Sequence, residues 1–421
     1  MDARTDERLK RAIAAVVVGN VLEWYDFVVF SYFAMIIAKN FFSAVDPAAL
    51  LSTFLTFGIG FIARPIGALV IGWFGDRHGR KAALLLTISL MALGTVAIGL
   101  VPSYASIGVA APILLAFARL MQGFSVGGEW GNATAYIVET APKGRRGYYA
   151  SFQQSSVVAG LLLGSAIAAI LNTVLEPAAV ESWGWRIPFL LGGIIGPVGL
   201  YIRRNINETP AYLKMTREPF AVDRDRALSL LKTAQAFGFM IVWAVMFYIF
   251  LAYMPTFTQK YAGLDGTAAL WSNTAGLLLL MVAIPPLGHL SDKIGRRPLL
   301  LASCAAFILL PYPLLNIMLD GASLGTIVTI QLVMALAIAL YSGPGAAAIA
   351  EIFPTRARTT LLSVANGTAV AIFGGFAPYI AERLIQATGS PLAPTYYVIA
   401  SAVVSAAVIV SMRETAHDNL G

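Results

Sequence analysis

Five charged side chains stand inside long apolar segments of the sequence, all of them in its first half. Glu23 and Asp26 lie in the first such segment, Arg64 in the second, and Arg119 and Glu129 in the fourth. An ionisable group in an apolar medium is costly and usually functional. A carboxylate removed from water takes up a proton more readily, and a guanidinium offers paired donors that match a carboxylate. The five residues therefore predict proton exchange combined with the binding of an anion.

Helical spacing places these residues on two polar stripes. At about 100° per residue, Asn20, Glu23 and Asp26 fall within roughly one third of a helix circumference. A polar stripe on a membrane helix must face a cavity or a partner helix. A structural ion pair of Arg119 with Glu23 or Asp26 would account for one acid, whereas three acids and two arginines favour a functional site. The second stripe comprises Arg119, Gln122, Ser125, Glu129 and Tyr136.

A proton carrier in these segments must be a carboxylate, because no histidine lies in the middle of one. The histidines are His78, His289 and His417. We rank Asp26 and Glu129 first as proton-coupling residues and Glu23 after them. The arginines are the expected ligands of an anionic substrate, and amide side chains would orient it. The predicted substrate-binding residues are Arg64, Arg119, Gln122, Asn20, Gln153 and Gln154.

Composition indicates the elements that must position this chemistry. Of 421 residues, 58% are hydrophobic and only 12% are charged, and the mean hydropathy is +0.75. A soluble domain has about a quarter of its residues charged, so an integral membrane protein is the class that remains. The single cysteine, Cys304, excludes an intrachain disulfide. With no metal-ligand cluster and no nucleophile–base pair, we expect no metal, no cofactor and no enzyme activity.

Twelve segments are long enough to span a bilayer as helices, which takes about 20 apolar residues. None shows the alternation of a barrel strand. We therefore predict an all-α integral membrane protein with twelve transmembrane helices. Its domains would be a six-helix bundle over 1–202, a cytoplasmic central loop over 203–231 and a second bundle over 232–421. The segments are about 12–38, 51–74, 82–101, 108–138, 150–172, 187–202, 232–257, 268–290, 299–318, 323–350, 359–381 and 394–412.

Lysine and arginine predict the orientation. With the N-terminus inside, 23 of the 29 basic residues fall on the cytoplasmic side and 4 on the outer side. This bias places both termini in the cytoplasm. The net charge of +7 is scattered between apolar segments, so it indicates membrane orientation and not a nucleic-acid partner. The first apolar run is far longer than the core of a signal peptide, and we expect no cleavable targeting segment.

The two halves of the sequence repeat each other. Gly72-x3-Asp76-Arg77-x-Gly79-Arg80 recurs 216 residues later as Gly288-x3-Asp292-Lys293-x-Gly295-Arg296, and Glu139 and Arg146 recur 212 residues later as Glu351 and Arg358. Such offsets imply a duplicated six-helix unit. Charge pairs at these helix ends can hold one conformation and release another. Loop arginines that only set topology would not need this spacing. The predicted conformational latch comprises Asp76, Arg77, Arg80, Glu139, Arg146, Asp292, Arg296, Glu351 and Arg358.

The repeated loop resembles the signature of the major facilitator superfamily. Four further motifs resemble its metabolite:proton symporter family. They are Gly19-Asn20-x2-Glu23-Trp24-Tyr25-Asp26-Phe27, Phe61-x2-Arg64-Pro65-x-Gly67, Arg119-x2-Gln122-Gly123-x3-Gly127-Gly128-Glu129 and Trp183-Gly-Trp185-Arg186-Ile-Pro188-Phe189. The resemblance covers about 12–412 and implies uptake of a metabolite across the bacterial inner membrane, driven by the proton gradient.

The resemblance leaves the substrate open between two classes. Gly-Gly-Glu129-Trp130-Gly and Tyr149-Ala-Ser151-Phe152-Gln153 are similar to the α-ketoglutarate permease branch, so we expect a small organic anion such as α-ketoglutarate, citrate or tricarballylate. The alternative is a zwitterionic osmolyte such as proline or betaine. A short tail after the last segment, where osmolyte carriers tend to have a coiled coil, speaks against it. A membrane receptor with a transporter-like fold is the alternative from another class.

The expected partners are substrate, protons and lipid, and the expected state is a monomer.

Overall fold

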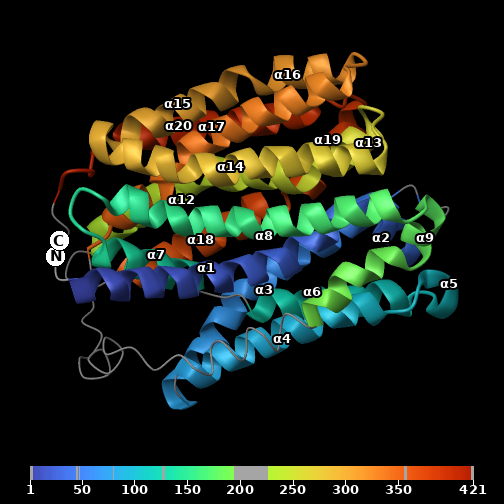
Figure 1. Ribbon diagram of the computed structural model, residues 1–421, viewed down its shortest axis with the longest axis horizontal. Helices are drawn as coiled ribbons and strands as arrows, with labels where there is room; N and C mark the ends of the chain where they lie inside the picture. Colours follow the sequence, from blue (N-terminus) through green and yellow to red (C-terminus); the bar gives the residue numbers. More distant parts are fainter. Residues whose placement is uncertain are drawn as a thin grey trace.

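A computed structural model describes residues 3–43, 46, 48–78, 80–125, 129–193, 226–354 and 358–418. Every regular element in these ranges is a helix. Figure 1 shows long helices running side by side, with both chain termini at one end of the molecule. We call this the near end, and the end that carries α5, α9 and α13 the far end. The all-helical membrane fold predicted from composition is confirmed.

The first half of the described chain contains the following α-helices and one short 3₁₀ helix, besides a helical stretch over 187–193. They are α1 (Ala3–Tyr32), α2 (Ala34–Phe41), α3 (Ala49–His78), α4 (Arg80–Leu100), α5 (Tyr104–Ile107), α6 (Ala110–Ser125), α7 (Glu129–Thr140), α8 (Arg146–Val174), α9 (Pro177–Ser182) and η1 (Gly184–Arg186).

The second half of the described chain includes two π-helices. Its elements are α12 (Arg226–Phe247), η2 (Tyr248–Tyr253), α13 (Met254–Lys260), α14 (Gly266–Ile294), α15 (Arg296–Leu309), α16 (Pro311–Leu319), α17 (Leu324–Glu351), α18 (Arg358–Ala369), η3 (Val370–Gly374), α19 (Ala377–Thr388) and α20 (Ala393–Ser411).

Eleven of the twelve predicted spans coincide with apolar helical segments. Within the described residues, 7 helical segments are long and apolar enough to cross a bilayer, or 9 when each bent pair counts as one span. Two shorter apolar helices, Leu85–Leu100 and Ala110–Ser125, match the third and fourth predictions. The sixth predicted span is described only as far as residue 193, and most of the predicted loop over 203–231 lies outside the described residues.

Several predicted spans are not continuous α-helices. The first bends by 63° between Tyr32 and Ala34, and the ninth bends by 43° between Leu309 and Pro311. Pro311 explains the second bend, because proline has no N–H and its ring clashes with the preceding turn. The seventh and eleventh spans each contain a π-helix, η2 and η3, and each π-helix is followed within a few residues by a proline, Pro255 or Pro378.

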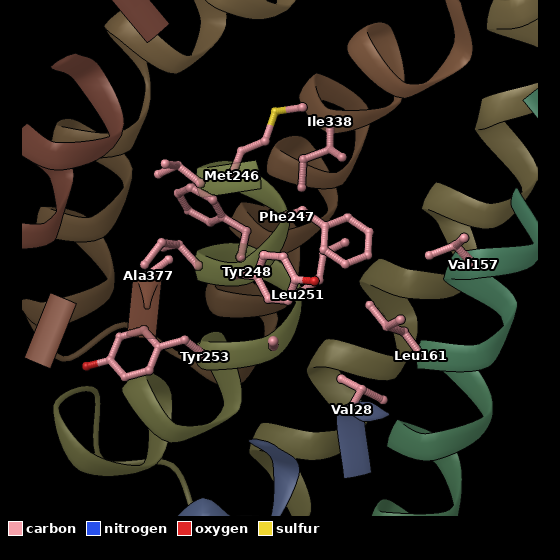
Figure 2. Packing of buried hydrophobic residues seen from close by; sticks show 14 of the residues in the cluster. Val28, Val157, Leu161, Met246, Phe247, Tyr248, Leu251, Tyr253, Ile338 and Ala377 are labelled. Carbon is pink, nitrogen blue, oxygen red and sulfur yellow. The ribbon is translucent and has the colours of Figure 1, made fainter. Parts of the chain in front are cut away.

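The seventh span forms the centre of the molecule. Its apolar stretch, within Leu230–Lys260, is 94% buried. Figure 2 shows Phe247, Tyr248 and Leu251 projecting from it among side chains of other helices, which include Val28, Val157 and Leu161. Aromatic and aliphatic side chains of both halves thus share one core. This span therefore packs against both halves of the chain.

Close helix crossings depend on glycine at specific places. A Cβ on Gly123 of α6 would lie 1.6 Å from the carbonyl oxygen of Gly60 in α3, and a Cβ on Gly67 would lie 1.8 Å from that of Phe124. The two backbones therefore touch, as expected for membrane helices that associate through small residues. This crossing fixes α3, and with it Arg64, against α6.

Candidate functional site

A cavity of about 320 Å³ lies between the two halves of the chain. Ligand sites typically have about 300–1,000 Å³, so a small metabolite fits. Among its lining residues, Leu69 of α3 is 76% exposed and Val364 of α18 is 53% exposed, so the cavity reaches the surface between these helices. Its polar and aromatic lining comprises Asn20, Glu23, Trp24, Arg64, Trp130, Gln154, Trp243, Phe247, Tyr248, Ser363, Asn366 and Thr368.

Arg64 is the basic residue that lines this cavity. Its guanidinium carbon lies 4.2 Å from the ring centre of Phe61 and 4.7 Å from that of Phe27. It interacts electrostatically with Glu23, which also lines the cavity. Its Nε is buried and has no hydrogen-bond partner. Aromatic faces attract a guanidinium but leave its N–H groups unsatisfied, so Arg64 can still bind an anion.

Aromatic side chains form much of the cavity wall. Trp24 of α1 packs edge-on against Phe247 at 5.4 Å between ring centres, and Trp130 of α7 packs edge-on against Trp243 at 5.9 Å. Trp243 donates a hydrogen bond to Ser342 Oγ (3.1 Å). Tyr248 is 3% exposed, and its hydroxyl has no hydrogen-bond partner. This part of the wall is therefore aromatic, and the buried hydroxyl of Tyr248 keeps its capacity for a hydrogen bond.

Asn20 and Gln154 add amide groups to the same cavity. Asn20 Nδ2 donates to Ser156 Oγ at 3.1 Å and to the carbonyl oxygen of Gln153 at 3.5 Å. These bonds join α1 to α8 and fix the amide of Asn20 at the cavity edge. Gln153 itself lies behind the wall, where its Oε1 accepts a hydrogen bond from Thr134 Oγ1 (2.6 Å).

Arg119 and Gln122 lie behind the cavity in an enclosed polar cluster. Arg119 is 0% exposed and surrounded by three phenylalanine rings at 4.4–4.8 Å. It donates a hydrogen bond to Gln122 Oε1 (2.8 Å), and Gln122 Nε2 donates to Thr95 Oγ1 (2.7 Å). Neither Arg119 nor Gln122 lines the cavity. In this conformation the two predicted arginines therefore do not face one space.

Asp26 lies at the end of this cluster and away from the cavity. It is 2% exposed and lies beside Thr95, and its Oδ1 has no hydrogen-bond partner. A Cβ on Gly192 would lie 2.5 Å from this oxygen. No ion pair joins Asp26 to Arg119, although both residues are described. The single polar stripe predicted for the first span thus divides: Asn20 and Glu23 face the cavity, and Asp26 faces α4.

The predicted site residues are therefore divided. Asn20, Glu23, Arg64 and Gln154 meet at the cavity, whereas the side chain of Glu129 lies outside the described part. Sequence reasoning did not single out Trp24, Trp130 or Asn366 as cavity residues. For the two tryptophans, the available signal was their position next to a glutamate inside an apolar segment. They were treated only as parts of a motif and not as cavity residues.

Charged residues of the repeated loop join the two halves at the near end. The carboxylate of Asp292, in the last turn of α14, accepts hydrogen bonds from the backbone N–H groups of Gly147 and Tyr148, both at 2.9 Å. These two residues lie in the first turn of α8. Arg296 pairs with Asp292 at 2.8 Å and with Glu351 at 3.3 Å. The acid thus caps a helix of the other half, where the free N–H groups favour a negative charge.

Two further ion pairs at this end also cross between the halves. Arg358 is 0% exposed and pairs with Glu139 at 2.6 Å, and Arg146 lies 3.8 Å from Glu351. In the first copy of the loop, Arg77 is exposed and stacks on Trp73 at 4.3 Å. The side chains of Asp76 and Arg80 lie outside the described residues. Of the described side chains in the two copies of the loop, Asp292 of the second copy contacts the other half.

The tail that follows α20 also packs into this network. Glu414 accepts hydrogen bonds from the backbone N–H groups of Arg296 and Arg297, both at 2.9 Å. Thr415 Oγ1 donates to Glu351 Oε2 (2.7 Å), and Arg146 donates to the carbonyl oxygen of Asp418 (2.9 Å). Burial alone would raise the pKa of Glu414, but the backbone donors bring this pKa below its usual value.

Known proteins are similar to this chain in sequence and in fold. A family model described as sugar (and other) transporter matches residues 12–220, and that of the Major Facilitator Superfamily matches 263–419. The chain is 38% identical to the citrate-proton symporter of Klebsiella pneumoniae, with 93% of this chain and 89% of that protein covered. It is 36% identical to the alpha-ketoglutarate permease of Escherichia coli K12, with 95% of this chain and 94% of that protein covered. It is 33% identical to the proline/betaine transporter of the same strain, with 98% of this chain and 85% of that protein covered.

The xylose transporter XylE of Escherichia coli, in a partially occluded inward open conformation, has the same fold. The TM-score is 0.78 with 19% sequence identity, over 98% of this chain and 99% of that one. The curated relatives are transporters and not enzymes. The chain therefore belongs to the major facilitator superfamily of membrane transporters, and within it to the metabolite:proton symporter family.

Proposed function

We propose that this protein imports a small organic anion, a di- or tricarboxylate, together with protons across the bacterial inner membrane. The observation that carries the proposal is Arg64, a basic residue that lines the cavity and keeps a buried Nε without a hydrogen-bond partner. A guanidinium binds a carboxylate through two parallel hydrogen bonds. The similarity to a citrate-proton symporter and an alpha-ketoglutarate permease supports this substrate class.

The proton site is distinct from the substrate site in this proposal. Asp26 is buried beside Thr95 and outside the cavity, whereas Glu23 lines the cavity and interacts with Arg64. A proton on Asp26 removes a buried charge before the loaded carrier changes conformation, and this links proton movement to substrate movement. Glu129 stays the third candidate. The proton gradient is the only driving force, and no cofactor is involved.

Alternating access would proceed around the cavity. The near-end network of Asp292, Arg296 and Glu351 closes one side, and its release would open that side while the far end closes. We place this near end and both termini in the cytoplasm because basic residues concentrate there. The transporter would act as a monomer in the bilayer.

A zwitterionic osmolyte is the second candidate, and a specific observation favours it. The cavity contains Glu23 together with the aromatic side chains of Trp24, Trp130 and Trp243. Aromatic faces and a carboxylate recognise a quaternary ammonium group, while Arg64 could bind the carboxylate of the same molecule. The proline/betaine transporter among the relatives supports this alternative.

Uptake by proteoliposomes tests both candidates. Purified protein in vesicles with an imposed inward proton gradient should accumulate radiolabelled citrate or α-ketoglutarate, and unlabelled dicarboxylates should compete. Glycine betaine and proline should not compete. Competition by glycine betaine alone would move the protein to the osmolyte class. If the uptake of every tested substrate is independent of the pH gradient, proton coupling is contradicted.

A further inference from the structure

A buried carboxylate at the far end has no role in the chemistry described above. Glu382 of α19 is 0% exposed and accepts hydrogen bonds from the hydroxyls of Tyr253 and Tyr261, both at 2.8 Å. It also pairs with Lys260, whose side chain is 34% exposed. Three donors satisfy this carboxylate in its charged form. The cluster joins α19 to the end of the seventh span.

Tyr253 connects this cluster to the π-helix η2. It is the last residue of η2, and Tyr248, which lines the cavity, is the first. Figure 2 shows Tyr248 and Tyr253 on the same short segment. A short π-helix within an α-helical segment is a local deformation that is frequent at functional sites. Contacts with neighbouring residues hold such a deformation in place. The bond from Tyr253 to Glu382 is such a contact.

Helix η2 also accepts hydrogen bonds from the first half of the chain near the far end, where α14 is hydrogen-bonded to α8 as well. Ser31 Oγ donates to the carbonyl oxygen of Ala252 (2.9 Å), and the Tyr32 hydroxyl donates to that of Leu251 (3.2 Å). Pro255 cannot donate to the carbonyl oxygen of Leu251 four residues earlier, so this acceptor is free for Tyr32. Phe54 of α3 packs edge-on against Tyr253 at 5.4 Å. One end of η2 therefore lines the cavity, and the other end contacts α1 and α3.

We propose that Glu382 is a positioning residue for transport: through Tyr253 it fixes η2, and η2 in turn sets Tyr248 in the cavity and closes the far end against α1. The inference extends the proposed function but does not depend on the substrate. Loss of the bond from Tyr253 should loosen the contact between η2 and α1. Loss of the bond from Tyr261, which lies outside η2, should not.

Two matched variants separate a positioning role from a structural one. Tyr253→Phe and Tyr261→Phe each remove one hydroxyl bonded at 2.8 Å to the same carboxylate. A Ser31→Cys reporter measures opening of the far end, because Ser31 is buried against η2. The only native cysteine, Cys304, is 1% exposed, so its background labelling is low. Labelling by a maleimide is followed on protein in lipid nanodiscs, which requires neither a substrate nor a known orientation.

We expect Tyr253→Phe to raise the labelling rate of the reporter several-fold and Tyr261→Phe to leave it within twofold. In proteoliposomes Tyr253→Phe should also raise KM for the transported carboxylate, with Tyr261→Phe as the control. Equal labelling in all backgrounds would overturn the proposal, and so would an equal increase in both variants, since Glu382 would then be a general anchor of the fold. Failure of carboxylate uptake alone would count against the proposed function and leave the labelling result standing.

Discussion

Arg64 and Arg119 are both surrounded by phenylalanine rings, but their guanidinium groups differ in access. Arg119 is 0% exposed and donates to Gln122 Oε1, whereas Arg64 is half-buried and lines the cavity. A buried guanidinium that already has an amide acceptor is less available to a ligand. At the scale of single residues, the anion site therefore rests on Arg64.

Replacing Arg64 by lysine tests this assignment. Arg64→Lys keeps the positive charge but loses the paired donors, and a charge-assisted hydrogen bond contributes roughly 1.5–3 kcal/mol. We expect KM for citrate or α-ketoglutarate uptake to rise about tenfold or more, with a much smaller change in maximal rate. Arg413→Lys, at an arginine whose side chain is 84% exposed and which belongs to no predicted site, should leave KM unchanged. An unchanged KM in Arg64→Lys would remove this residue from the site.

The two carboxylates of α1 should differ in their mutant kinetics. Asp26→Asn should abolish accumulation driven by a pH gradient while substrate exchange survives, because Asp26 lies outside the cavity. Glu23→Gln should also change the KM for exchange, because Glu23 borders Arg64. Both are measured in proteoliposomes by comparing gradient-driven uptake with counterflow. Normal accumulation in Asp26→Asn would transfer the proton role to Glu23 or Glu129.

At the scale of elements, the contact of Asp292 with α8 resembles an ordinary helix cap whose acid comes from another part of the chain. Its carboxylate faces the N–H groups of Gly147 and Tyr148 across the boundary between the halves. A charge at a helix terminus contributes roughly 0.3–1 kcal/mol, and up to about 2 kcal/mol when partly buried. This is enough to shift a two-state equilibrium several-fold.

Asp292→Asn should therefore open the near end. A Ser151→Cys reporter is suitable, because Ser151 is 0% exposed and lies where a Cβ on Gly288 would approach within 2.7 Å. We expect maleimide labelling of this cysteine to be several-fold faster in Asp292→Asn than in the parent. Lys293→Gln, a change at the neighbouring exposed residue, is the control and should have little effect. No difference between the two variants would contradict the latch.

The sequence predicted helices and charged positions better than the directions in which side chains point. Eleven spans were located, and Glu23 and Arg64, both expected in the middle of a span, line the same cavity. A stripe covering one third of a helix is wide, so its edges can face different neighbours, and Glu23 and Asp26 do so. Glu382 was overlooked because the eleventh span was expected to end at residue 381, while α19 continues to Thr388. The bend at Phe33 has no signal such as proline.

At the scale of the whole molecule, the tail after α20 joins the two halves. Glu414 caps the start of α15, and Arg146 of the first half donates to the carbonyl oxygen of Asp418. The sequence offered no reason to place a short charged tail in a buried network. The tail contacts Glu351, Arg296 and Arg146, which were predicted from the repeat as latch residues.

The pH dependence of stability follows from Glu414. Because backbone donors hold its pKa below the usual value of 4.5, its charged form stabilises the folded state above that pH, and this contribution is lost as the pH falls through the folded-state pKa. Glu414→Gln should therefore lower the melting temperature by a constant amount from pH 8 to about pH 5, and the difference should shrink below that. Thermal unfolding in detergent measures this. A difference that grows on acidification would contradict the assigned sign.

The bond between Asp292 and α8 has a consequence for how this protein tolerates mutation. Its donors are peptide N–H groups, which every residue except proline possesses. Tyr148→Ala would leave its donor in place, whereas a Cβ at Gly147 would lie 2.3 Å from Arg296 Nη1 and 2.6 Å from the carbonyl oxygen of Gly288. Tyr148→Pro, in contrast, deletes one donor within the first turn of the helix, where proline is tolerated. The donor of Tyr148 is thus insensitive to most side-chain substitutions, while Gly147 on this side and the acid on the other side have little freedom to change.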